Sequence, residues 1–184
     1  GIGTQYLGGA FFTSHSGATI TNTEFSQNKG HMSAFAAYGS VNVSGSTFTN
    51  NIGVDLNWDA IFGFRSIIYS LGLSMTNTTV SNNLGTIESS KDLTFDQVTF
   101  TNNIGEIRGY STSSIINSNL SNNTTYDEDG ENAFLLFDRG GTVEIKNTIV
   151  SGNTHSGDYG FMYSRNTTLI SNSIFSDNTT TASY

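Results

Sequence analysis

The chain repeats one short pattern seven times, and this repetition constrains its fold more than any other feature of the sequence. In each repeat a large apolar residue is followed at once by Ser or Thr and, three positions on, by Asn. Another apolar residue lies five positions before the large one. Because a repeat this short cannot bury its apolar face alone, the repeats must stack on one another. The large apolar residues are Phe25, Phe48, Val80, Phe100, Leu120, Val150 and Phe175, and those five positions earlier are Ile20, Val43, Met75, Phe95, Ile115, Ile145 and Ile170.

Apolar and polar residues alternate within each repeat, which is typical of a β-strand with one buried face. The residue three positions before the large apolar one is usually Asn, which favours a turn through the left-handed region. The shortest spacing is 20 residues, from Val80 to Phe100 and again to Leu120, which leaves room for three short strands and no helix. The sequence therefore predicts an all-β fold, a single-stranded right-handed parallel β-helix of about seven coils with three short strands per coil. We expect one domain over residues 1–184, with insertions at 52–72 and 124–142.

The recurrent Asn and apolar residues have structural roles in such a fold. Identical amides in successive coils can each donate a hydrogen bond to one neighbour and accept one from the other, which forms a ladder along the stack. The Phe, Ile and Val residues that recur with them are expected to form columns of the core. Candidate catalytic or ligand-binding residues are therefore expected outside these columns.

The composition excludes several classes of function. The chain has 7 Lys and Arg against 15 Asp and Glu, and this net charge of −8 argues against binding to nucleic acid. It has no Cys, which excludes a disulfide scaffold and Cys-based metal or nucleophile chemistry. No apolar run approaches the roughly 20 residues of a membrane helix, so we expect no membrane insertion.

The repeat resembles those of right-handed parallel β-helix proteins of the pectin-lyase-like fold, and it is similar to the repeats of chlamydial polymorphic outer-membrane proteins. The segment Gly-Gly-Ala-Phe at 8–11 resembles the Gly-Gly-Ala-Ile mark of that family. The second mark, Phe-x-x-Asn, occurs at Phe25, Phe48, Phe100 and Phe175. The resemblance implies the β-helical fold and the broader group of surface-exposed adhesive or structural β-helices.

The best candidate for a ligand site is an acidic cluster in the 124–142 insertion, where Asp127, Asp129 and Glu131 surround Gly130. Carboxylate oxygens on a Gly-containing loop suit Ca²⁺. A solvated acidic loop is the simpler interpretation. We therefore expect no cofactor, with Ca²⁺ at these three residues as the alternative.

No other constellation indicates catalysis. The three His residues, His15, His31 and His155, lie in different repeats without the spacing of metal ligands. Acidic residues cluster in insertions, and the repeat register is not expected to bring carboxylates together with Lys or Arg. Trp58, in the 52–72 insertion, can stack on a sugar ring, pack in the core or contact another protein. We expect that the chain is not an enzyme.

Seven Asn residues stand in N-glycosylation sequons. Asn77, Asn123 and Asn178 are expected to lie in the Asn ladders and to be buried. The candidates for glycosylation are those expected on outward or loop positions, Asn42, Asn119, Asn122 and Asn166.

Three functions follow from this sequence as hypotheses. The leading one is an extracellular or cell-surface structural or adhesive rod, either a segment of a longer chain or a filament subunit. Its partners would be neighbouring coils of the same protein or further copies bound head to tail, with glycans as other candidates. The alternative is a carbohydrate-active enzyme or glycan-binding module of pectin-lyase-like fold. Ice binding is the third, because Thr flanks the large apolar residue at Thr47-x-Thr49 and Thr99-x-Thr101, although other repeats break these rows.

Overall fold

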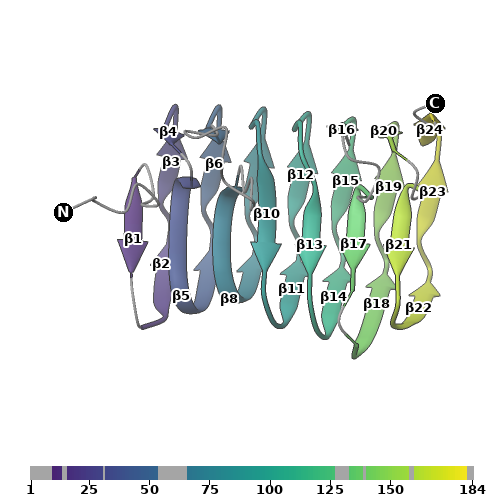
Figure 1. Ribbon diagram of the computed structural model, residues 1–184, viewed down its shortest axis with the longest axis horizontal. Helices are drawn as coiled ribbons and strands as arrows, with labels where there is room; N and C mark the ends of the chain where they lie inside the picture. The colour runs from purple at the N-terminus through teal and green to yellow at the C-terminus, as the bar shows by residue number, and fades with distance from the viewer. Residues whose placement is uncertain are drawn as a thin grey trace.

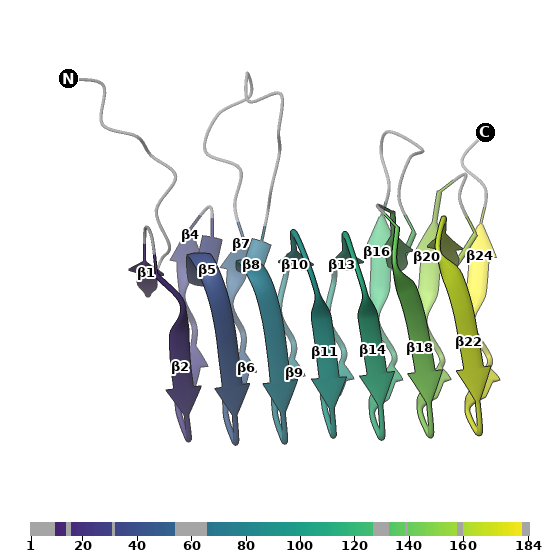
Figure 2. The ribbon, with the colours of Figure 1, turned by 90° about the horizontal axis from the view of Figure 1, so that it is seen from below.

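The computed structural model describes residues 10–13, 16–30, 32–53, 66–126, 133–138, 140–157 and 160–181. In these residues every regular element is a β-strand and every strand pairing is parallel. The strands stack side by side into an elongated body, with the repeats following one another along its long axis (Figures 1 and 2). The predicted all-β architecture of stacked parallel sheets is confirmed, and the arrangement is compatible with a parallel β-helix.

Four parallel sheets contain the strands. The twelve-stranded sheet contains β1 (Phe11–Thr13), β2 (Ala18–Thr21), β5 (Met32–Ser44), β8 (Ser66–Thr76), β10 (Thr86–Ser89), β11 (Leu93–Asp96), β13 (Ile107–Gly109), β14 (Ser113–Ile116), β17 (Leu135–Phe137), β18 (Thr142–Lys146), β21 (Met162–Ser164) and β22 (Thr167–Ser171). The seven-stranded sheet contains β3 (Glu24–Ser26), β6 (Thr47–Thr49), β9 (Thr79–Ser81), β12 (Thr99–Thr101), β15 (Asn119–Ser121), β19 (Ile149–Ser151) and β23 (Ile174–Ser176). The two small sheets contain β16 (Thr124–Tyr126), β20 (Thr154–Ser156) and β24 (Thr179–Thr181), and β4 (Lys29–Gly30) and β7 (Ile52–Gly53).

Two long strands distinguish the second and third repeats from the later ones. β5 has 13 residues and β8 has 11, and the two short strands β10 and β11 of the next repeat pair with the two parts of β8. The expected three short strands per repeat therefore do not hold here, because the first two are continuous. Of the segment 52–72 that the sequence sets apart, residues 66–72 belong to the twelve-stranded sheet.

The two apolar columns predicted from the repeat are aligned by the strand register. Each large apolar residue pairs with its counterpart in the next repeat along the seven-stranded sheet, from Phe25 to Phe175. The residues five positions earlier do the same, from Ile20 to Ile170, along the twelve-stranded sheet. The members from the second to the sixth repeat are buried. The columns therefore form the core.

The predicted burial is wrong at the end of the columns. Ile170 is 51% exposed and Phe175 38% exposed, and at the other end Phe25 is half-buried. Each of these residues has a neighbouring repeat on one side only among the described residues. Burial in this fold is supplied by the repeats above and below, so a residue with one such neighbour keeps much of its surface in contact with water.

At two corners of each repeat the backbone adopts the left-handed conformation. The residue three positions before the large apolar one has φ between 48° and 58° in all seven repeats, as the sequence predicts. The second corner lies two positions after the large apolar residue, for example at Asn102 with φ 56°. Asn adopts this conformation at lower cost than most other residues, which explains why Asn recurs at both corners.

The ladder of buried Asn side chains is also confirmed. The Nδ2 group of Asn83 donates to Oδ1 of Asn103 (2.9 Å) and to the carbonyl of Phe48 (2.9 Å), and its backbone N–H donates to the same Oδ1 (3.0 Å). The amide thus uses both of its own hydrogens. The side-chain link between successive repeats recurs from Asn28 to Asn178.

Candidate binding surface on the twelve-stranded sheet

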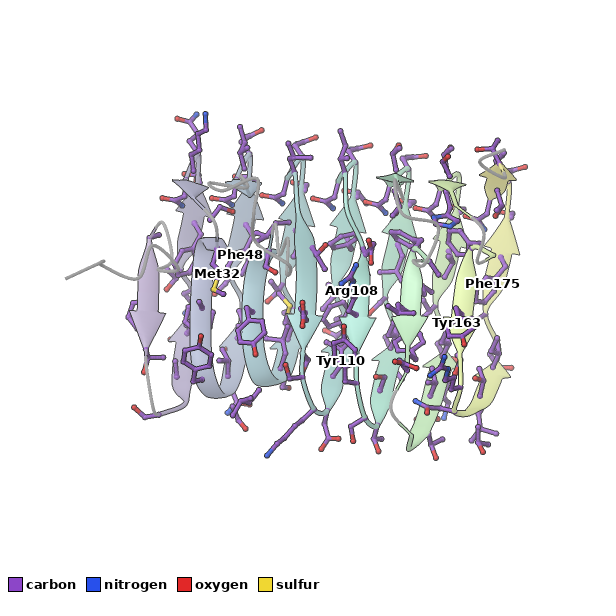
Figure 3. All side chains as sticks on the ribbon, viewed as in Figure 1. Met32, Phe48, Arg108, Tyr110, Tyr163 and Phe175 are labelled. Atoms are coloured by element: carbon purple, nitrogen blue, oxygen red, sulfur yellow. The ribbon has the colours of Figure 1, made fainter. Side chains whose placement is uncertain are left out.

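The face of the twelve-stranded sheet opposite the core carries a row of aromatic and charged side chains. Successive residues of a strand point to opposite faces, so the core residue Ile87 of β10 is followed by Glu88 on the other face. The register places Glu88 beside Tyr69 and Arg108. Figure 3 labels Arg108 on β13, Tyr110 directly after this strand, and Tyr163 on β21. The register aligns Ala36, Tyr69, Glu88, Arg108, Leu136 and Tyr163 in one row, and Tyr38 and Tyr110 lie two residues further along their segments. We name this region the tyrosine strip and define it by Tyr38, Tyr69, Glu88, Arg108, Tyr110, Leu136 and Tyr163.

Arg108 is the central charge of the strip. Its Nε donates to Oε2 of Glu106 at 2.5 Å, and both Glu106 and Glu88 are buried. Burial alone would lower the pKa of Arg108, but the hydrogen bond and charge of Glu106, with smaller effects of Tyr110 and Glu88, raise it above its usual value. The guanidinium is therefore permanently charged and held in place beside two carboxylate side chains.

Tyrosines stand at both ends of the strip. The rings of Tyr38 and Tyr69 meet edge to face with their centroids 5.9 Å apart, and the Ser90 hydroxyl donates to the Tyr69 hydroxyl at 3.2 Å. At the other end, Nε of Arg165 donates to the Tyr163 hydroxyl at 2.8 Å. Tyr38 is 45% exposed, whereas the rings of the other tyrosines of the strip are half-buried. The strip thus offers aromatic surface held by defined contacts.

The residues that the sequence singled out for chemistry are mostly elsewhere. Asp127, Asp129 and Glu131, the Ca²⁺ candidates, lie outside the described residues, as do Trp58, His15 and His31. His155 is buried in β20. Within the described ranges, no group of three His, Cys, Asp or Glu side chains could hold a metal ion, and no helix has the length and hydropathy of a membrane span.

The Asn residues of the sequons differ in their exposure to solvent. Of the glycosylation candidates, Asn42 and Asn122 are exposed, whereas Asn119 and Asn166 are half-buried. The predicted burial of Asn77 is wrong, because this residue occupies an exposed left-handed corner and not the ladder. Of the two other sequons assigned to the ladder, Asn123 is buried, as predicted, and Asn178 is half-buried.

The strip was not predicted from the sequence, and the expectation that the register keeps carboxylates away from basic residues is wrong. Glu88 and Arg108 occupy the same place in their repeats, because each directly follows an Ile that lies eight positions before a core residue. The register that aligned Phe95 with Ile115 therefore also aligned Glu88 with Arg108. Glu106 joins them because it lies two positions before Arg108, on the same face of the chain.

Comparison with known proteins gives no match: no family model fits the chain, and no similar protein was found among the curated proteins or the solved structures. What the strip can do therefore follows from its own chemistry. Tyrosine rings offer flat apolar faces, and the partly exposed guanidinium of Arg108 can donate hydrogen bonds, whereas the Glu88 and Glu106 side chains are buried. Such a surface suits a ligand that has apolar faces and hydrogen-bond acceptors.

Proposed function

We propose that the chain is a stiff β-helical rod with a structural or adhesive role outside the cell or on its surface. In this proposal the seven repeats are about seven coils of one single-stranded right-handed parallel β-helix. The observation that carries the proposal is the Asn ladder, which joins every repeat from Asn28 to Asn178. Sliding or bending one repeat against the next would break buried hydrogen bonds, so a body built in this way is stiff.

The proposal includes association end to end. In the seventh repeat the core-column residues Ile170 and Phe175 are exposed, and no described strand pairs with the outer edges of β22, β23 and β24. Each interior Asn of the ladder accepts hydrogen bonds from the repeat before it and donates to the repeat after it. By this pattern the seventh repeat presents donors and the first presents an acceptor. Two such ends are complementary, and a contact that repeats by translation gives an open fibre.

We expect the 184-residue chain to form linear oligomers that lengthen as its concentration rises. Sedimentation velocity and electron microscopy would follow their length and width. Ile170→Lys should abolish the association, because it places a charge on the apolar end. Since Ile170 is half exposed, this change should leave the fold intact.

Ile149→Lys is the matched control, because Ile149 is 44% exposed but lies on the side of the body, in β19. This variant should associate like the parent chain. A parent chain that stays monomeric at every concentration, or association that both substitutions block equally, would overturn the end-to-end contact.

Glycan binding is the second candidate function, and the tyrosine strip favours it. A rod with such a surface would be adhesive as well as structural. We do not propose ice binding, because neither outward row of the seven-stranded sheet is a regular row of Thr. In the first row Thr occupies only three adjacent places, Thr47, Thr79 and Thr99, between Glu24 and Asn119. In the second row, which directly follows the large apolar residues, every place is Ser or Thr, but only Thr49 and Thr101 are Thr.

A further inference from the structure

The strands at the two ends of the stack match one another. The first repeat contributes β1, β2, β3 and β4, and each of these strands pairs with a described neighbour on one side only. The seventh repeat contributes β21, β22, β23 and β24 at the opposite end of the body (Figure 1), and the same holds for them. An unpaired strand edge is a template for another chain. Because every described pairing is parallel, a second copy in the same orientation can extend all the sheets.

The Asn ladder gives such a contact a direction. Asn178 accepts from the backbone N–H and the Nδ2 group of Asn153, and it donates to the carbonyl of Val150 (2.8 Å). Its backbone N–H and its second Nδ2 hydrogen donate to no described residue. At the other end Asn28 donates to Asn51, while its own Oδ1 accepts from no described residue. Two copies joined by the same end would place donor against donor or acceptor against acceptor, so only a head-to-tail contact continues the ladder.

The core columns select one register for this contact. Phe25 is half-buried and stacks on Phe48, with the ring centroids 4.9 Å apart and 3° between the ring planes. Phe175 is 38% exposed at the other end of the same column. Placing Phe25 of the next copy on Phe175 repeats a contact that neighbouring repeats of the chain already make. The same register covers the exposed Ile170 with Ile20 of the next copy, whereas a shift by one residue would turn both columns outward.

The charges at the two ends are compatible with this register. In the described parts of the first and seventh repeats the charged residues are Glu24, Lys29, Arg165 and Asp177. Glu24 of the next copy would pair with the apolar Ile174, because both belong to the first outward row of the seven-stranded sheet. Lys29 of the next copy lies two residues beyond the place that aligns with Asp177. The register therefore brings charges of opposite sign to one corner.

We infer that the seventh repeat binds the first repeat of a second copy in a single register, in which β21, β22, β23 and β24 pair in parallel with β1, β2, β3 and β4 of that copy. This inference rests on the proposed end-to-end association and names its contact surfaces and polarity. Asn178 donates to Oδ1 of Asn28 of the next copy, and both core columns continue from copy to copy. Seven steps of about 4.8 Å give the filament an axial repeat of about 34 Å.

Cross-linking of introduced Cys residues tests this register. Ser26 and Ser176 belong to one outward row, and the inference makes them neighbours across the contact, about 4.8 Å apart between Cα atoms. A disulfide spans that distance, whereas it cannot span the roughly 29 Å that separates the two residues within one chain. Under mild oxidation Ser26→Cys with Ser176→Cys should give covalent dimers, trimers and longer chains. A mixture of the two single variants should give only a dimer that contains one copy of each.

Ser26→Cys with Ser151→Cys is the matched control. Ser151 lies in the same row as Ser176 but one repeat further from the end, about 9.6 Å from Ser26 of the next copy and beyond the reach of a disulfide. This variant should give no covalent chains. Equal cross-linking of the control would show that the register is not fixed, and covalent dimers of Ser176→Cys alone would show a tail-to-tail contact.

Sedimentation of the same samples distinguishes failure of this inference from failure of the proposed association. Linear oligomers that the Ser26→Cys with Ser176→Cys variant does not cross-link, or filaments whose axial repeat in electron micrographs is not close to 34 Å, would overturn the register and leave end-to-end association standing. A chain that stays monomeric at every concentration would overturn both.

Discussion

Replacing Asn103 by Leu should lower the free energy of unfolding more than any other single change considered for this chain. Asn103 accepts hydrogen bonds from the backbone N–H and the Nδ2 group of Asn83, and it donates one to the carbonyl of Val80. Leu has a similar volume but leaves these three buried groups without partners. Each buried group without a partner costs about 1–3 kcal/mol, so we expect the free energy of unfolding to fall by about 4 kcal/mol or more. Denaturant unfolding followed by circular dichroism would measure it.

Asn102→Gly is the matched control for this substitution. Asn102 is the adjacent residue, but it is exposed and stands at a left-handed corner with φ 56°. Gly adopts that conformation without strain, so the change in stability should be within about 1 kcal/mol. Similar losses in both variants would mean that the corner, and not the ladder, stabilises the stack.

Replacing Phe100 by Ala should cost about 3–5 kcal/mol of unfolding free energy, because it opens a cavity in the middle of the core. Phe100 is fully buried, and its strand pairs with β9 on one side and β15 on the other. The centroid of its ring lies 6.2 Å from the centroid of the Phe134 ring. The neighbouring repeats cannot close the cavity without breaking their own strand pairing. Thermal and denaturant unfolding would both report the loss.

Phe100→Leu separates the cavity from the loss of the aromatic ring. Leu120 occupies the same place in the next repeat, so the column accepts Leu without a change of register. A replacement of roughly similar volume should cost less than about 1.5 kcal/mol. If Phe100→Ala were as mild as Phe100→Leu, the side chain would not be in a closed core.

The fold was predictable where the sequence repeats, because a residue that recurs once per repeat pairs with its own counterpart. The recurrence of Asn103 and Phe100 therefore gave both the buried ladder and the core column. Asn77 was assigned wrongly, since the sequence alone does not distinguish an Asn that turns the chain from one that binds its neighbours. The exposure of Ile170 depends on what lies beyond its repeat, which the repeat pattern does not encode.

The tyrosine strip was harder to predict because its members differ from repeat to repeat. Tyr69, Glu88, Arg108 and Tyr163 are of different types, so no recurrence marks them. An insertion of variable length also separates Arg108 from the aligned residue Leu136 of the next repeat. Their neighbourhood follows only from the strand register, which the scaffold residues set.

The most direct test of this account is the distance between repeats along the axis. The chain has no Cys, so pairs of introduced Cys residues can be labelled with nitroxides without interference. Ile174→Cys would be combined in turn with Glu24→Cys, Thr47→Cys and Thr79→Cys, which all lie in one outward row of the seven-stranded sheet. The labelled chain would be diluted with unlabelled chain, and pulsed electron spin resonance would measure the distances. Stacked repeats predict about 29, 24 and 19 Å, a fall of about 4.8 Å per repeat. Distances that do not fall with the number of intervening repeats would contradict the stacking of the seven repeats in order.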